Sequence, residues 1–264
     1  MKIAVHMFGH LRTFKRCAVK LKENLNNENL DSTFSLFIHT WNTIDTNTSE
    51  LPDIFLEKEI IAHYDFFSEI NILIEKQKDI IMTFPKDQFF GIRCMHYSLS
   101  KSISLYLNKN KFDYDLHLII RPDILLESKL CLSNFESAFD RNKDLYTALY
   151  IHEHIKSLNF NNILGGIDIL FIVRPSIISK MINITNTPNI YKPHKSGRLG
   201  EPQFINFLEV MNIRWSFLNF IGGNDWRILR KRSNTKKYIF YTLSQLKSLM
   251  RNIYYICRNI IRGC

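Results

Sequence analysis

An arginine and an aspartate, separated by one proline, follow an apolar segment near the middle of the chain. The segment Leu116–Ile120 fits a buried strand, and Arg121, Pro122 and Asp123 come directly after it. Proline lacks an N–H and fixes its own φ, so it ends strand pairing and holds the flanking side chains in one orientation. Ligands of α/β proteins bind at the carboxyl ends of strands. The triplet therefore predicts a site for a charged ligand, although a surface ion pair explains it equally well.

A second polar turn follows the first apolar segment of the chain. Lys2–Phe8 fits a buried strand, and Gly9, His10 and Arg12 lie between it and the next helical pattern. Backbone N–H groups before a helix, together with a guanidinium, are suited to binding phosphate. The turn is not a G-x-G-x-x-G sequence, so it gives no support to a dinucleotide fold.

The end of the second apolar segment carries aromatic side chains. His39, Thr40 and Trp41 close the strand expected over Thr33–His39. An indole could stack on a base or close the core, and a histidine at a strand end could bind a phosphate. We expect His39 to contact the ligand and Trp41 to pack.

Two further segments carry candidate residues in the second half of the chain. Gly165 and Gly166 precede Asp168, and paired glycines let a backbone approach a ligand closely, although an ordinary turn before a strand needs them as well. Glu201 stands before Pro202 at an expected helix start. There a carboxylate could act as a base or simply interact favourably with the helix dipole.

The elements that must position these residues alternate between strands and helices, which predicts an α/β fold. Residues 60–67 and 70–74 carry patterns too weak to type. The remaining strands and helices are expected over Leu145–Tyr150, Asp168–Val173 and Ile213–Leu218, and over Thr13–Asn26, Phe89–Asn108, Pro175–Ile182 and Glu201–Met211, respectively.

Composition indicates one domain with a basic tail. The chain has 264 residues and 45% hydrophobic content, enough for one substantial core. Its five cysteines are scattered, which favours a reducing compartment without structural zinc, and the N-terminus has no signal-peptide pattern. The net charge of +10 arises from the ten cations of residues 227–264, a segment without Asp or Glu.

The basic tail has the pattern of an amphipathic helix. Over residues 231–264, cations fall on one helical face and Leu and Ile side chains on the opposite face. Such a helix suits an anionic membrane surface, and no uninterrupted apolar run is long enough to span a bilayer. A helix packed on the domain and a nucleic-acid-binding arm are the alternatives.

The order of these segments resembles the GT-A-type glycosyltransferases of bacterial surface polysaccharide synthesis. It is similar in particular to a group with a G-x-x-R-T-F turn, then F-I-H-T-W, then I-R-P-D. The matching segments are Gly9–Phe14, Phe37–Trp41 and Ile120–Asp123, and the resemblance covers most of residues 1–230. It implies a single GT-A-like, Rossmann-like domain with a mixed, mostly parallel sheet over 1–230.

The resemblance also implies roles for individual residues. In GT-A enzymes an Asp-x-Asp holds a divalent cation on the donor diphosphate, a Gly-rich turn shapes the acceptor side, and a later acid is often the base. By this similarity Asp123 matches the last Asp, Gly165 and Gly166 the Gly-rich turn, and Glu201 the base, with Asp168 as second choice. The donor phosphates would contact the candidates at the first three strand ends and one further arginine: Gly9, His10, Arg12, His39, Arg121 and Arg227.

Arg121 departs from the family pattern because it replaces the first Asp of Asp-x-Asp. A guanidinium repels a divalent cation, which prefers anionic oxygen ligands. Two designs fit: Asp123 binds Mg²⁺ or Mn²⁺ with waters and phosphates, or Arg121 and Arg12 neutralise the leaving diphosphate without metal.

The hypothesis from the sequence is an enzyme on the cytoplasmic face of the bacterial inner membrane, held there peripherally by residues 231–264. It would move a sugar from a nucleotide-sugar donor to a lipid-linked saccharide of O-antigen, lipopolysaccharide core or capsule. The alternatives are a basic nucleic-acid-binding protein and a catalytically degenerate scaffold or saccharide-binding module. Nucleic acid is the less expected partner, because in residues 1–226 the 25 cations balance the 25 acids.

Overall fold

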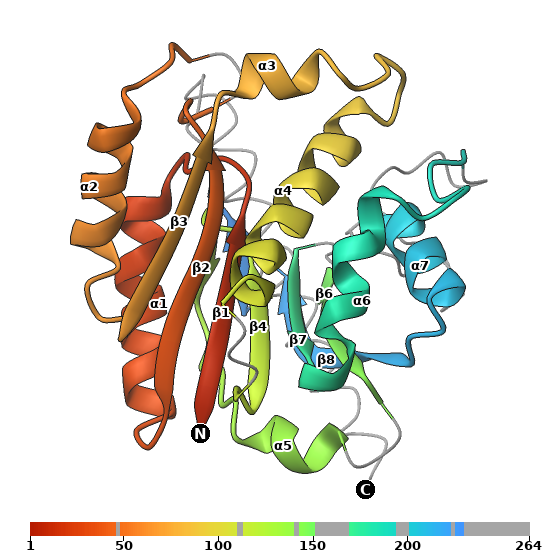
Figure 1. Ribbon diagram of the computed structural model, residues 1–264. Helices are drawn as coiled ribbons and strands as arrows, with labels where there is room; N and C mark the ends of the chain where they lie inside the picture. Colours follow the sequence, from red (N-terminus) through yellow and green to blue (C-terminus); the bar gives the residue numbers. More distant parts are fainter. Residues whose placement is uncertain are drawn as a thin grey trace, which may run out of the picture.

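The computed structural model confirms the predicted fold class: a mixed α/β protein built on a mostly parallel sheet (Figure 1). The tail over 231–264 lies outside the described residues, so the expected helix there stays a prediction, as does the division of the chain at residue 230. The structure describes residues 1–45, 48–109, 113–139, 143–150, 169–193, 201–222 and 225–229.

Nine strands of the described residues form one sheet in the order β3-β2-β1-β4-β7-β6-β8-β9-β5. The first four in this order are parallel, and β7 runs antiparallel to both β4 and β6. The strands are β1 (Lys2–Phe8), β2 (Thr33–Trp41), β3 (Glu69–Glu75), β4 (Leu116–Ile120), β5 (Ile124–Leu126), β6 (Leu145–Tyr150), β7 (Leu170–Val173), β8 (Trp215–Gly222) and β9 (Trp226–Ile228).

Helices cover both faces of this sheet (Figure 1). The long helix α4 lies on the face opposite α1 and α2, and α6 and α7 pack on the same side as α4. The helices are α1 (Phe14–Glu28), α2 (Asp53–His63), α3 (Gln77–Ile81), α4 (Phe90–Leu107), α5 (Asn134–Phe139), α6 (Ile178–Met181) and α7 (Glu201–Val210), with 3-10 turns at Pro175–Ile177 and Ile182–Thr185.

Strand alternation divides the core into two layers. Ile3, Val5 and Met7 of β1 point toward α1 and α2, whereas Ala4 and Phe8 point toward α4. This is the period-2 pattern of a strand buried on both faces, and it is why the sequence of β1 reads as continuously apolar. Among the described residues, no helix combines the length and the apolarity that crossing a bilayer requires.

The chain crosses to the other face of the sheet between β3 and β4. The connections β1-α1-β2 and β2-α2-β3 run on one face, whereas α4, which leads into β4, runs on the other. Because β1 pairs with both β2 and β4, their carboxyl ends lie side by side at this change of direction. In open α/β sheets a crevice forms at such a point and binds ligands.

Of the two segments that the sequence left untyped, residues 60–67 include the last turn of α2 and residues 70–74 lie within β3. Ile54, Phe55 and Ile61 of α2 stay exposed, so this helix is apolar on more than one side and its period is blurred. All residues of β3 are partly buried, because β3 is an edge strand that pairs only with β2. Neither element shows the clear hydrophobic period on which sequence-based prediction depends.

Candidate functional site

The turn after β1 has an unusual backbone. Gly9 adopts φ +101° and Arg12 adopts φ 30°, both on the positive side that side chains disfavour. The N–H of Arg12 donates to the carbonyl of Ile44 at 2.9 Å, which ties the turn to the loop after β2. A non-glycine residue in such a conformation costs roughly 1 kcal/mol or more and is found preferentially at functional sites. The fold therefore holds Arg12 in place against its own preference.

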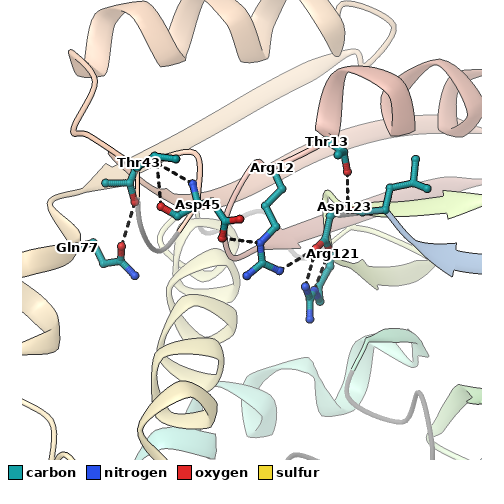
Figure 2. Close-up of polar contacts among 9 residues, drawn as sticks. Arg12, Thr13, Thr43, Asp45, Gln77, Arg121 and Asp123 are labelled. Atoms are coloured by element: carbon teal, nitrogen blue, oxygen red, sulfur yellow. Dashed lines mark hydrogen bonds and ion pairs between the residues drawn. The ribbon is translucent and has the colours of Figure 1, made fainter. Parts of the chain in front are cut away.

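The guanidinium of Arg12 lies between two carboxylates (Figure 2). Its Nε donates to Asp45 Oδ1 at 3.0 Å, and its Nη1 donates to Asp123 Oδ2 at 3.0 Å. Arg121 binds the same Asp123 with two donors: Nε to Oδ1 at 2.9 Å and Nη2 to Oδ2 at 2.7 Å. The sequence predicted Arg12 at one strand end and Arg121 with Asp123 at another, and the fold brings these three residues into one cluster with Asp45, which the sequence did not single out.

The cluster has a buried centre and an accessible rim. The side chain of Asp123 is 1% exposed, those of Arg12 and Arg121 are 17% and 16% exposed, and that of Asp45 is 40% exposed. Asp123 is thus the fixed acceptor that orients both guanidiniums, while Asp45 is open to solvent. Two cations balance two carboxylates, so an anion would bind most favourably by displacing Asp45 from Arg12.

Asp123 does not fit a resident divalent cation. Both of its oxygens accept hydrogen bonds from guanidinium groups, and a cation there would meet Arg12 and Arg121 at close range. In the described part of the chain no cluster of three or more His, Cys, Asp or Glu side chains could hold a metal ion. Of the two designs left open by the sequence, the contacts favour the one in which the arginines neutralise the phosphates.

His10 lies at the edge of the cluster. Burial lowers the pKa of His10, a hydrogen bond with the Gln77 side chain opposes this effect, and the Arg12 charge lowers the pKa further. The Gln77 side chain also accepts from Thr43 Oγ1 at 3.0 Å, so the loop after β2 and the start of α3 close this side of the site (Figure 2). At neutral pH His10 is an uncharged group able to accept or donate a hydrogen bond.

The structure places His39 behind the site rather than in it. Its ring is fully buried, and both nitrogens are hydrogen-bonded within the protein, Nδ1 to Ser98 Oγ at 2.6 Å and Nε2 to Glu75 Oε2 at 2.8 Å. A hydrogen bond from His39 to a ligand, as expected from the sequence, would require at least one of these two bonds to break. Trp41 is buried as expected and stacks on Tyr97.

The amide of Gly9 also points into the protein, because its N–H donates to Ser98 Oγ at 2.7 Å. Gly9 therefore shapes the turn, and this N–H is not directed at a ligand. The sequence could not reveal this role of Ser98, because Ser98 is one of several serines along α4.

The last described strand closes the site from the α1 side. Leu229 donates its N–H to the Asp123 carbonyl at 2.8 Å, and its own carbonyl accepts from Thr13 Oγ1 at 2.7 Å (Figure 2). Arg227, two residues earlier on β9, pairs with Glu127 instead of joining the arginine cluster. A phosphate contact by Arg227 would have to displace that carboxylate.

The remaining candidates are not brought to the cluster by the described structure. Gly165, Gly166 and Asp168 lie outside the described residues. Glu201 begins α7, as expected, which places its backbone at a helix start on the α4 side of the sheet.

Comparison with solved structures found 448 similar chains, including two that cover at least 90% of this chain. One, a nucleoside-diphosphate-sugar pyrophosphorylase from Vibrio cholerae RC9, is 12% identical, with 90% of this chain and 98% of that chain covered and a TM-score of 0.47. The other, a putative glucose-1-phosphate thymidylyltransferase from Bacillus anthracis in complex with sucrose, is 8% identical, with 93% and 96% covered and a TM-score of 0.49. No family model and no curated protein matches the chain.

Proposed function

We propose that the protein is a glycosyltransferase that binds the diphosphate of a nucleotide sugar at the Arg12–Asp123–Arg121 cluster. The observation that carries this proposal is the geometry of the two guanidiniums, which one buried carboxylate orients at the carboxyl ends of β1 and β4. Arginine binds phosphate oxygens through paired N–H groups, and two arginines side by side match the two phosphoryl groups of a diphosphate. The motif resemblance in residues 1–230 supports the same substrate class.

The arginines would act on the leaving group of the reaction. As the bond between the sugar and the diphosphate breaks, negative charge develops on the phosphate oxygens, and pre-oriented cations stabilise that charge. Asp123 would keep both guanidiniums in position before the donor arrives, so less reorganisation is needed in the transition state.

A base must also remove the proton of the acceptor hydroxyl in a direct displacement. Glu201 at the start of α7 is our first candidate and Asp168 the second, with Gly165 and Gly166 proposed on the acceptor side. These roles rest on the family resemblance.

The acceptor we propose is a lipid-linked saccharide of bacterial surface polysaccharide. The support is the cationic and apolar pattern of residues 231–264, which suits an anionic membrane surface on the cytoplasmic side. Because the described chain reaches Leu229 beside Asp123, that segment follows the site directly in the sequence.

A transfer assay tests this function. The full chain is incubated with nucleotide-sugar donors and a lipid extract containing lipid-linked saccharides, and release of nucleoside diphosphate is followed with and without EDTA. We expect one donor to be consumed only when the lipid is present, and Glu201→Gln to abolish transfer while donor binding persists. Consumption of no donor by wild-type protein would contradict the proposal.

A further inference from the structure

A chain of hydrogen bonds links the Gly9 turn to the opposite edge of the parallel strands. It runs from the Gly9 N–H to Ser98 Oγ at 2.7 Å, from Ser98 Oγ to His39 Nδ1 at 2.6 Å, and from His39 Nε2 to Glu75 Oε2 at 2.8 Å. Four elements contribute: the end of β1, α4, β2 and the end of β3. The bonded residues are far apart in the sequence, so these hydrogen bonds form only when the fold brings the four elements together.

The distances favour one direction for these hydrogen bonds. An amide N–H can only donate, so Ser98 Oγ accepts from Gly9. The single Ser98 hydrogen has two acceptors in reach, His39 Nδ1 at 2.6 Å and the His39 carbonyl at 3.3 Å, and the shorter distance favours Nδ1. His39 then carries its proton on Nε2 and donates to the Glu75 carboxylate. In this neutral tautomer every polar group along the path is satisfied, although Ser98 and His39 are fully buried.

The surroundings of His39 favour this neutral form. Burial lowers the pKa of His39, and the bond to Glu75 and the Glu75 charge oppose that effect without reversing it. Glu75 in turn accepts from the Tyr97 hydroxyl at 3.2 Å and lies 3.9 Å from Lys101 Nζ. Trp41, on the same strand, packs its ring edge-on against His39 with the ring centroids 4.9 Å apart.

We propose that Ser98, His39 and Glu75 are positioning residues that hold the Gly9 turn, and through it Arg12, in the conformation that binds the anionic ligand. Gly9 sits at φ +101° and Arg12 at φ 30°, so the turn needs an anchor at each end. Ser98 supplies the anchor at Gly9, and the Ile44 carbonyl supplies the anchor at Arg12. The identity of the ligand rests on the proposed function, whereas the hydrogen-bond chain does not.

The first test observes the Gly9 amide directly. Protein labelled with ¹⁵N-glycine is used to measure hydrogen exchange of Gly9 in wild type, Ser98→Ala and Ser98→Thr. Threonine keeps the hydroxyl and alanine removes it, so we expect Gly9 exchange to accelerate at least about tenfold in Ser98→Ala and to stay near the wild-type rate in Ser98→Thr. Ser104→Ala is the matched control, because Ser104 Oγ donates only within α4, to the Ser100 carbonyl at 2.9 Å.

The second test measures how the hydrogen bonds from Gly9 to Glu75 affect the affinity for nucleoside diphosphate. Titration of nucleoside diphosphate is expected to show about tenfold weaker affinity for Ser98→Ala and unchanged affinity for Ser98→Thr and Ser104→Ala. Protonating His39 adds a hydrogen on Nδ1, so Ser98 Oγ must accept from His39 as well as from Gly9 while its own hydrogen turns to the His39 carbonyl at 3.3 Å. We expect this rearrangement to weaken the Gly9 anchor, so affinity should fall at acidic pH. Glu75→Gln removes the charge that favours protonated His39, and the acid loss should therefore move to lower pH.

The outcomes separate this inference from the proposed function. Unchanged Gly9 exchange in Ser98→Ala would overturn the positioning role whatever the protein binds. Faster Gly9 exchange in Ser98→Ala, combined with no nucleotide binding by wild type, would uphold the anchor and contradict the proposed donor. Equal acid loss of affinity in wild type and Glu75→Gln would overturn the part assigned to His39.

Discussion

Arg12 and Asp123 meet through a 3.0 Å hydrogen bond across 111 residues of sequence, and this bond joins the carboxyl ends of β1 and β4. Arg121 binds the same carboxylate from the other side, so a single 1%-exposed side chain orients two cations. If one arginine is removed, Asp123 still pairs with the other. If Asp123 is removed, both guanidiniums lose the carboxylate that they share.

Replacing Asp123 by asparagine should therefore destabilise the protein. The amide keeps the shape but removes the negative charge between the two guanidiniums, and its NH2 group faces a guanidinium donor in place of an acceptor oxygen. We expect the free energy of unfolding to fall by about 3 kcal/mol, as for other buried ion pairs that lose one partner. Urea denaturation measures this change.

Asp113→Asn is the matched control for that substitution. Asp113 pairs with Lys2 at a position where both side chains are more than half exposed, and such pairs contribute about 0.5 kcal/mol or less. Equal effects of the two substitutions would contradict the structural role of Asp123.

Two glycines make a second matched pair. Gly9→Ala places a side chain at φ +101°, and we expect a loss of about 1–2 kcal/mol even though no atom lies within 4 Å of the added Cβ. Gly91→Ala lies in the exposed first turn of α4, with equal space, and should be neutral or stabilising by about 0.5 kcal/mol. Thermal unfolding of both variants checks the difference. Two similar shifts would mean that the backbone of the Gly9 turn is not constrained.

Asp45 should limit the affinity of the site for anions. It is the exposed acceptor of Arg12, and an incoming phosphate must compete with it. Asp45→Asn is expected to strengthen nucleoside diphosphate binding about fivefold, on the order of 1 kcal/mol. Asp53→Asn, on the exposed first turn of α2, controls for the change in net charge. Weaker binding by Asp45→Asn would identify Asp45 as a ligand contact instead of a competitor.

Stability should decline in mild acid because of histidines buried between the sheet and α4. Burial lowers the pKa of His6 to about 4 and that of His96 to about 3, and it lowers the pKa of His117 well below its ordinary value. The folded state thus binds fewer protons than the unfolded state, whose histidines titrate near 6.5. The contribution of these neutral histidines to the free energy of unfolding is therefore fully present above about pH 6.5. It is lost as the pH falls toward the pKa values of the folded state.

Between pH 7.5 and pH 5, His6 alone should contribute a loss of about 2 kcal/mol. Urea denaturation across this range gives the slope. His96→Leu removes one of the titrations and should flatten the slope. Identical slopes for wild type and His96→Leu would show that His96 is not held neutral.

The sequence identified the strand ends but could not show which side chains meet there. Arg12 and Asp123 were predicted separately, each from an apolar strand and a polar turn, because those signals are local. Their contact depends on the strand order β2-β1-β4, which no local pattern encodes. Asp45 was hidden for the same reason, since it lies in a polar loop that looks like any other.

His39 shows the opposite difficulty. A histidine at the end of a buried strand resembles a ligand contact, and only its partners reveal that both ring nitrogens are already used. Ser98 and Glu75, which supply those partners, come from α4 and β3, and β3 was too weakly patterned to be typed from the sequence.

Calorimetric titration of nucleoside diphosphates and nucleotide sugars, with Mn²⁺ or with EDTA, tests the central claim most directly. We expect wild-type protein to bind one diphosphate series equally well with and without metal, and Arg12→Gln and Arg121→Gln each to weaken binding at least about tenfold. Arg214→Gln is the control, because Arg214 makes a similar two-donor pair with Asp144 at the amino ends of β6 and β8, away from the carboxyl ends of β1 and β4. Undiminished binding in both site variants, or binding that requires Mn²⁺ and survives their loss, would contradict the assignment of the arginine cluster as the diphosphate site.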